Sequence, residues 1–170
     1  MEYFVHDTAI VEDDVVIGKG SKIWHWVHVV SGAQMGKGCV LGQNVYEGGR
    51  TKLGNNVRVQ NNVSIYDDVY LEDDVFCGPS MVFTNVINPR SHVNRKNEYL
   101  KTVVKKGASI GANATIVCGN EIGEYAFIGA GTVITKPVSA YALVVGNPGR
   151  QIGWVSRAGI RLNFDNDGFA

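Results

Sequence analysis

The stretch IGKGSKIWHWVHVVSGAQM, residues 17–35, carries a large apolar residue at every sixth position. These residues are Ile17, Ile23, Val29 and Met35. An amphipathic helix has a period of 3.6 residues and a half-buried strand has a period of two, so neither explains an interval of six. The interval is typical of a parallel β-helix, in which each hexad forms one short strand and one turn of a triangular coil.

The same interval extends along most of the chain. The anchor positions are Val5, Val11, Ile17, Ile23, Val29, Met35, Leu41, Glu47, Leu53, Val59, Ile65, Leu71, Cys77 and Phe83, and, after a break, Val104, Ile110, Ile116, Ile122, Ile128 and Ile134. A smaller or β-branched residue usually follows four places later, as with Ser21, Ala33 and Ala108. A β-sandwich would show strands that alternate with period two and turn signals every 8–12 residues. We therefore predict an all-β hexapeptide-repeat β-helix over residues 1–147.

The repeat is interrupted in three places, and interruptions of a strong repeat are where function is expected. The spacing from Phe83 to Val104 predicts an inserted loop over 85–103, whose basic residues suit an anionic ligand such as a diphosphate. Glu47 has two open interpretations: it turns outward toward a site, or it is a salt-bridged irregularity of a strand. Residues 148–170 leave the repeat and are expected to form a short C-terminal helix and tail that cover the last coil.

Three hexads make one coil, so residues 18 apart are expected to lie one above another. This predicts four outward-facing columns: His25, Gln43, Asn61 and Pro79; Trp26, Asn44, Asn62 and Ser80; His28, Tyr46, Ser64 and Val82; and Gly49, Asp67 and Asn85. Outward amides beside Trp24 and Trp26 suit a subunit boundary or a ligand pocket. The alternative is a set of Asn and Gln ladders that hydrogen-bond from coil to coil.

Composition narrows the class of protein. The 170 residues contain 16 basic and 16 acidic side chains, a balance that argues against nucleic acid or an anionic membrane as a partner. No basic region followed by an apolar run begins the chain, and no apolar stretch approaches the ~20 residues of a membrane span, so we expect a cytoplasmic protein. Cys39 and Cys77 fall on inward positions and Cys118 on an outward one, which predicts reduced thiols.

Several segments together resemble a known family. They are residues 23–28 (IWHWVH), 41–45 (LGQNV), 60–67 (QNNVSIYD), 76–85 (FCGPSMVFTN), 88–90 (NPR) and 150–154 (RQIGW). The chain is similar to hexapeptide-repeat nucleotide-sugar N-acetyltransferases, in particular those acting on UDP-2-acetamido-3-amino-2,3-dideoxy-glucuronate. The resemblance implies a left-handed β-helix, an exception to right-handed crossovers. It also implies a homotrimer with sites between subunits, acetyl-CoA as co-substrate, and a role in bacterial surface polysaccharide (O-antigen) synthesis.

The resemblance also implies a role for Asn85, and further site residues are expected from their own position and chemistry. Asn85 would orient the attacking amine, with the departing CoA sulfur as proton acceptor; a histidine base is the alternative, with His28 first and His25 next. The substrate residues expected are Gln43, Asn61, Asn62, Tyr66, Asp67, Arg90 and Lys105. Acetyl-CoA is expected to contact the close-approaching backbone of Gly111, Ala112, Gly129 and Ala130 and to bring its phosphates to Lys136 and Arg150.

Three other functions remain as alternatives. The first is acetylation of a dTDP-3-amino-deoxyhexose by the same mechanism. The second is a zinc enzyme on the same fold, but His6, His25, His28 and His92 lack the His-x4-His spacing of γ-class carbonic anhydrases, so no metal is expected. The third is a non-catalytic β-helix scaffold, which would have no reason to keep the amide columns, the basic loop and Arg150 together.

Overall fold

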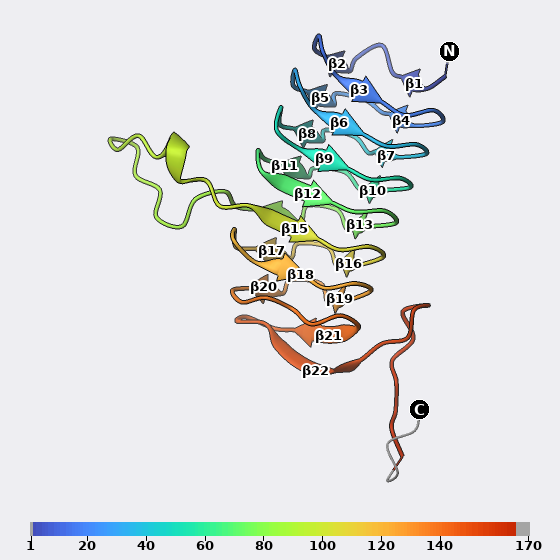
Figure 1. The fold of residues 1–170 in the computed structure, drawn as a ribbon, viewed down its shortest axis with the longest axis vertical. Helices are drawn as coiled ribbons and strands as arrows, with labels where there is room; N and C mark the ends of the chain where they lie inside the picture. The colour runs from blue at the N-terminus through green and yellow to red at the C-terminus, as the bar shows by residue number, and fades with distance from the viewer. Residues whose placement is uncertain (1, 166–170) are drawn as a thin grey trace.

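The structure is a computed structural model that describes residues 2–165. Its chain winds as a triangular prism of short parallel strands, with the N-terminus at one end of the stack and the C-terminus at the other (Figure 1). Each coil contributes one strand to each of three faces, which we call sheets A, B and C. The predicted left-handed β-helix of hexapeptide repeats is confirmed.

The three sheets contain nine, seven and six strands among the described residues. Sheet A consists of β1 (Phe4–Val5), β4 (Lys22–Ile23), β7 (Val40–Leu41), β10 (Arg58–Val59), β13 (Phe76–Cys77), β16 (Ser109–Ile110), β19 (Phe127–Ile128), β21 (Ala142–Val145) and β22 (Arg150–Trp154). Sheet B consists of β2 (Ile10–Val11), β5 (His28–Val29), β8 (Tyr46–Glu47), β11 (Ser64–Ile65), β14 (Val82–Phe83), β17 (Thr115–Ile116) and β20 (Val133–Ile134). Sheet C consists of β3 (Val16–Ile17), β6 (Gln34–Met35), β9 (Lys52–Leu53), β12 (Val69–Leu71), β15 (Thr102–Val104) and β18 (Glu121–Ile122).

The register of the sheets reproduces the interval of 18 residues. Ile23 pairs with Leu41, and Leu41 with Val59, so anchors stack directly along the interior. These three side chains are fully buried. The smaller residues of the repeat, such as Ala33 and Ala114, are buried as well. Burial of one stacked apolar row per face is therefore the main stabilising contribution, as expected for a solenoid.

Three edges of the prism connect the sheets, and each edge is a stack of tight turns. We call them the A–B edge (for example residues 42–45 and 60–63), the B–C edge (48–51 and 66–68) and the C–A edge (36–39 and 54–57). Asn44, Asn62 and Ser80 on the A–B edge all have φ near +60°, the left-handed conformation that Asn tolerates better than most residues. Repetition of this geometry keeps successive turns in register.

The inserted loop leaves the stack at the B–C edge. It runs between β14 and β15, contains the 3₁₀ helix η1 (Lys96–Glu98), and projects sideways from the prism (Figure 1). The loop begins on the coil below Tyr66 and Asp67 and returns to sheet C without disturbing it, because Leu71 still pairs with Val104. The prediction of an inserted loop is confirmed.

Glu47 lies inside the core, so both interpretations of this residue are wrong. It occupies the anchor position of β8 between Val29 and Ile65 and is fully buried. Its Oε1 accepts a hydrogen bond from Thr51 Oγ1 at 3.0 Å, whereas Oε2 has no hydrogen-bond partner among the described residues. Burial raises the pKa of Glu47 to about 8, so the side chain is a neutral acid at neutral pH.

The end of the chain also differs from the prediction. Residues 150–154 form β22, which pairs antiparallel with β21, and no helix follows it through residue 165. A strand satisfies the open hydrogen-bonding groups of β21 directly, which a helix packed on the coil would not. Residues 166–170 of the predicted tail lie outside the described residues. No helix between residues 2 and 165 is long and apolar enough to cross a bilayer.

The cysteines are free thiols, as predicted, but one position is wrong. Cys39 and Cys77 are buried in the interior, and burial raises the pKa of Cys77 to about 12. Cys118 was expected to face outward, yet it is only 2% exposed. Its backbone N–H donates to Thr84 Oγ1 at 3.0 Å, so the base of the inserted loop covers this turn.

Candidate active site

Asn85 and Tyr66 line one cavity at the B–C edge. Its volume is about 570 Å³, and the start of the inserted loop forms one wall. The lining residues are Tyr66, Val82, Phe83, Thr84, Asn85, Val86, Ile87, Pro89 and Val117. None of these described residues carries a charge. The polar side-chain groups of this cavity are therefore one amide, one phenol and the Thr84 hydroxyl, which accepts the Cys118 N–H, within an otherwise largely apolar lining.

Asn85 also lines a second cavity of about 570 Å³ on the loop side. Arg90, Arg95, Lys96 and Tyr99 contribute to it. Arg95 is held by Glu98, with Nη1 2.8 and 2.9 Å from the two carboxylate oxygens. Asn85 thus stands between an uncharged cavity and a basic one, which suits a ligand with a neutral reacting end and an anionic tail.

Asp67 forms an ion pair and a hydrogen bond with Arg50. Its Oδ2 lies 3.3 Å from Arg50 Nη1, and its Oδ1 accepts a hydrogen bond from the Arg50 backbone N–H at 3.2 Å. Its role as a substrate residue stays a prediction. The geometry nevertheless shows that Asp67 braces the turn above the loop.

His28 is oriented by a carboxylate that the sequence did not suggest. Its Nε2 lies 2.6 Å from Glu12 Oε1, and Glu12 Oε2 accepts the Ser31 N–H at 3.0 Å. The Ser31 bond first, and then the His28 bond, lower the pKa of Glu12. His28 contacts Tyr46 edge-on, with ring centroids 5.8 Å apart. The pair has the form of an oriented catalytic histidine, and equally of a structural ion pair on the outer face of sheet B.

The structure does not bring His28 and Asn85 together within one chain. His28 lies on β5 and Asn85 follows β14, and these strands are three positions apart in sheet B. At ~4.8 Å per strand the separation along the prism is ~14 Å. Tyr46 and Tyr66 occupy part of the interval, with ring centroids 6.0 Å apart. This distance is too long for direct proton transfer between a substrate held by Asn85 and His28 of the same chain.

The amides of the A–B edge form ladders between coils. The backbone N–H of Gln43 donates to Asn61 Oδ1 at 2.9 Å, and Asn44 Nδ2 donates to Asn62 Oδ1 at 3.1 Å. The two columns predicted on this edge are therefore present. Gln43 and Asn61 also line a shallow cavity with Trp24 and His25, on the edge opposite sheet C rather than at Asn85. The observed bonds favour the ladder interpretation for Asn61 and Asn62, whereas Gln43 contributes only its backbone N–H to the ladder.

Lys105 lies at the C–A edge, away from Asn85. Its Nζ is 3.0 Å from Glu72 Oε1 and 3.8 Å from Glu121 Oε2, and these contacts raise its pKa. The groove along sheet C that it lines, about 650 Å³, also contains Tyr70 and Lys101. Within one chain, Lys105 and the Asn85 cavities cannot hold the same small sugar.

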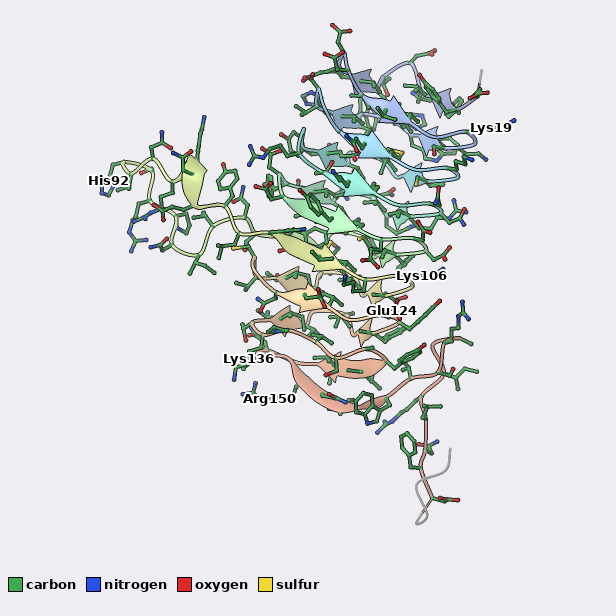
Figure 2. The ribbon with its side chains drawn as sticks, in the orientation of Figure 1. Lys19, His92, Lys106, Glu124, Lys136 and Arg150 are labelled. Atoms are coloured by element: carbon green, nitrogen blue, oxygen red, sulfur yellow. The ribbon has the colours of Figure 1, made fainter. Side chains whose placement is uncertain are left out.

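The residues expected to hold acetyl-CoA fall into two groups. Gly111, Ala112, Gly129 and Ala130 lie together on the A–B edge, where a Cβ on Gly111 would come within 2.5 Å of the Ala130 nitrogen. Lys136 and Arg150 lie together beside the last coil, lining one cavity, on the same side of the molecule as the loop (Figure 2). The outer face of sheet B separates the two groups. A ligand contacting both would have to cross β17 and β20.

Sequence reasoning missed the partners that hold the loop and the histidine. Arg50 and Tyr99 contact each other, with the guanidinium carbon 5.8 Å from the ring centroid. The spacing of 18 between Arg50 and Asp68 was a usable signal, because residues at that interval stack. Glu12 and His28 are 16 apart, a diagonal contact between coils that the repeat does not single out.

Two family models match the chain. The bacterial transferase hexapeptide model (six repeats) matches residues 4–46. The hexapeptide repeat of succinyl-transferase matches residues 33–67 and 102–136. Residues 85–101 of the inserted loop lie between the two matches of this second model, as expected for a segment outside the repeat.

One curated relative is similar over nearly the whole chain. It is the dTDP-3-amino-3,6-dideoxy-alpha-D-galactopyranose 3-N-acetyltransferase of Aneurinibacillus thermoaerophilus, 48% identical over 161 residues. The match covers 95% of this chain and 83% of the relative.

Solved structures share the fold at lower identity. The acetyltransferase domain of PglB from Neisseria gonorrhoeae, in complex with acetyl coenzyme A, aligns with a TM-score of 0.59 and 20% identity over 89% of this chain. PerB from Caulobacter crescentus, in complex with CoA and GDP-perosamine, aligns with a TM-score of 0.55 and 18% identity over 88% of this chain. The alignments cover 58% and 56% of those chains. The chain belongs to the hexapeptide-repeat acetyltransferase family, and its homologues there include nucleotide-sugar N-acetyltransferases.

Proposed function

We propose that this protein transfers the acetyl group of acetyl-CoA to the 3-amino group of a dTDP-linked 3-amino-3,6-dideoxyhexose. The observation that carries the choice of sugar is the uncharged cavity at Asn85, whose walls include Val82, Ile87 and Val117. A 6-deoxy sugar presents a methyl group at carbon 5, which apolar walls accommodate. A uronate presents a carboxylate there, and burying a charge without a partner is costly. The 48% identical relative supports the same substrate class.

The proposed chemistry needs little from the protein. A neutral amine attacks the thioester carbonyl, the C–N bond forms, and the C–S bond of the tetrahedral intermediate breaks. The amine proton leaves with the CoA sulfur, which gives the N-acetyl sugar and CoA thiol. Asn85 would accept an N–H bond from the amine and so aim its lone pair, which is the orientation effect expected to dominate. Tyr66 would bound the sugar on the other side.

The basic cavity on the loop side would receive the diphosphate. Arg90, Arg95 and Lys96 line it next to Asn85, so a nucleotide sugar lying through both cavities would place its anion among these cations. Acetyl-CoA would approach along sheet B, with its phosphates near Lys136 and Arg150. This leaves Lys105 and the A–B amides outside the single-chain sugar site.

We also propose that the active protein is a homotrimer in the cytoplasm with sites between copies. Trp24 and Trp26 are 38% and 59% exposed, which is unusual for single tryptophans on a free surface and typical of an interface. A neighbouring copy would also supply groups that one chain holds far from Asn85, His28 among them. Sedimentation at several protein concentrations tests the trimer directly.

A uronate substrate is the second candidate, favoured by Arg90 beside Asn85. The test is the rate of thiol release from acetyl-CoA with three acceptors: the dTDP-3-amino-3,6-dideoxyhexose, the UDP-3-amino-uronate, and a dTDP-6-deoxyhexose with a 3-hydroxyl as control. Turnover with the first acceptor alone is the expected result. Turnover with the uronate alone would keep the reaction and overturn the choice of sugar. If folded wild-type protein releases no thiol with either amine acceptor, the proposed function is overturned.

A further inference from the structure

Arg50 connects the rigid coils to the inserted loop. It lies on the B–C edge, one coil above Asp67 and Asp68, and its guanidinium faces the ring of Tyr99 from the loop. We propose that Arg50 is a positioning residue, a latch that holds residues 84–101 against the B–C edge and thereby fixes Asn85. The effect on catalysis rests on the proposed function, whereas the effect on the loop does not.

Two carboxylates fix the orientation of the guanidinium. Asp68 accepts from Nε at 3.2 Å and from Nη2 at 2.8 Å, the forked arrangement that an arginine and a carboxylate form best. Asp67 lies 3.3 Å from Nη1 and also accepts the Arg50 backbone N–H. All three nitrogens of the guanidinium therefore contact a carboxylate oxygen. The two aspartates of the coil therefore fix the plane of the guanidinium without any contact from the loop.

The loop meets this plane through Tyr99. The guanidinium carbon lies 5.8 Å from the centre of the Tyr99 ring, within the range of a cation–π contact. The next residue, Leu100, donates its backbone N–H to the Asn85 carbonyl at 3.0 Å. Two residues further on, Thr102 donates its N–H to the Asp68 carbonyl at 3.0 Å. A short series of contacts thus runs from Arg50 through Tyr99 and Leu100 to the backbone of Asn85.

The latch is separable from the stability of the prism. The Arg50 side chain is 56% exposed, and exposed ion pairs contribute little to global stability. The coils on either side are held by buried anchors such as Ile65 and Leu71. Removing Arg50 should loosen the loop and leave the β-helix intact, so a local measurement can detect it.

The first experiment measures amide hydrogen exchange of residues 86–99 in the full protein without substrates. Arg50→Ala and Tyr99→Ala are each expected to speed exchange in this segment about tenfold or more, while exchange in the strands stays as in wild type. Arg50→Lys should also lose the protection, because an ammonium lacks the fork. Tyr99→Phe should keep it, because the contact needs only the ring. Arg58→Ala, an exposed arginine on sheet A, is the matched control.

The double variant Arg50→Ala/Tyr99→Ala separates a latch from two independent effects. If the two residues act on the loop through each other, the double variant exchanges no faster than either single one. Multiplied effects, or wild-type exchange in Arg50→Ala, would overturn the proposal.

Steady-state kinetics then test the link to Asn85. Arg50→Ala is expected to lower kcat about tenfold with a smaller change in the KM for acetyl-CoA, because the loop carries Asn85 and not the acetyl donor. Faster loop exchange with an unchanged kcat would overturn the positioning role. If wild-type protein transfers no acetyl group yet the exchange results hold, the proposed function fails and the latch on the loop stands.

Discussion

The A–B and B–C edges are built from the same repeat and contain similar polar residues, yet they use them differently. On the A–B edge every turn stays in register, and Asn61 and Asn62 bond to the coil above. On the B–C edge the inserted loop replaces one turn, and Asn85 at the start of this loop lines two cavities. A regular stack brings polar groups of successive coils within hydrogen-bonding distance, so groups remain available for a ligand mainly where the stack is interrupted.

An interruption in the sequence is not always an interruption in space, and Glu47 is the clearest case. The carboxyl stays protonated in the folded protein up to a pH of about 8, whereas in the unfolded chain it ionises above about 4.5. Its contribution to stability is therefore fully present below pH 4.5 and is lost as the pH rises to about 8. As the pH rises through this window, the free energy of unfolding of Glu47→Leu should increase relative to that of wild type, by on the order of 5 kcal/mol in total.

Denaturant unfolding of wild type and Glu47→Leu at pH 5.5 and pH 8.5 measures the effect. The free-energy difference between the two proteins should be larger at pH 8.5. Glu121→Gln is the control, because Glu121 is an exposed carboxylate and its loss should leave the pH dependence almost unchanged. Equal differences at the two pH values would show that Glu47 is not a buried neutral acid.

The second test compares Asn85 with another asparagine of the same loop. Asn85→Ala should lower kcat by about 10²-fold or more, because the amine loses its orientation while the backbone of the loop is unchanged. Asn88→Ala, three residues further on, is the matched control and should retain activity within about threefold. A wild-type rate for Asn85→Ala would remove the B–C edge from the proposed mechanism.

The sequence predicted most of the fold because one rule repeats. A six-residue interval places Ile23, Leu41 and Val59 in the core whatever their neighbours are, and the interval of 18 correctly stacked Asn44 on Asn62. The rule fails where a contact has no fixed spacing. Cys118 is buried because the loop covers its turn, and β22 replaces the expected helix because β21 leaves an open edge.

The candidate site was predicted only in part, for the same reason. The columns placed Asp67 and Asn85 on one edge, but the position of Tyr99 depends on the path of residues 84–101 between β14 and β15, which no repeat describes. Lys105 is among the residues predicted to bind the sugar. In space, sheet C and the turn after it place Lys105 against Glu72 instead.

The third test asks whether the A–B ladder is structural. Asn61→Ala removes the acceptor of the Gln43 N–H and is expected to cost about 1 kcal/mol of unfolding free energy. The change in kcat/KM should stay below about threefold. Gln60→Ala, in the same turn, controls for a general effect of side-chain loss. A raised KM for the nucleotide sugar with unchanged stability would contradict the ladder and place Asn61 at a ligand.

The smallest effect is expected at His28, and it separates one chain from an assembly. If the CoA sulfur takes the proton, His28→Ala should lower kcat by less than about threefold, and Glu12→Gln, which removes the carboxylate beside it, should do no more. A fall of 10²-fold, together with loss of the acidic limb of the pH–rate profile, would instead make His28 a general base. Because ~14 Å separate His28 from Asn85 along one prism, that result would require the histidine to come from a neighbouring copy. The active site would then be complete only across a subunit boundary, with the loop of one copy lying on the sheet B face of the next.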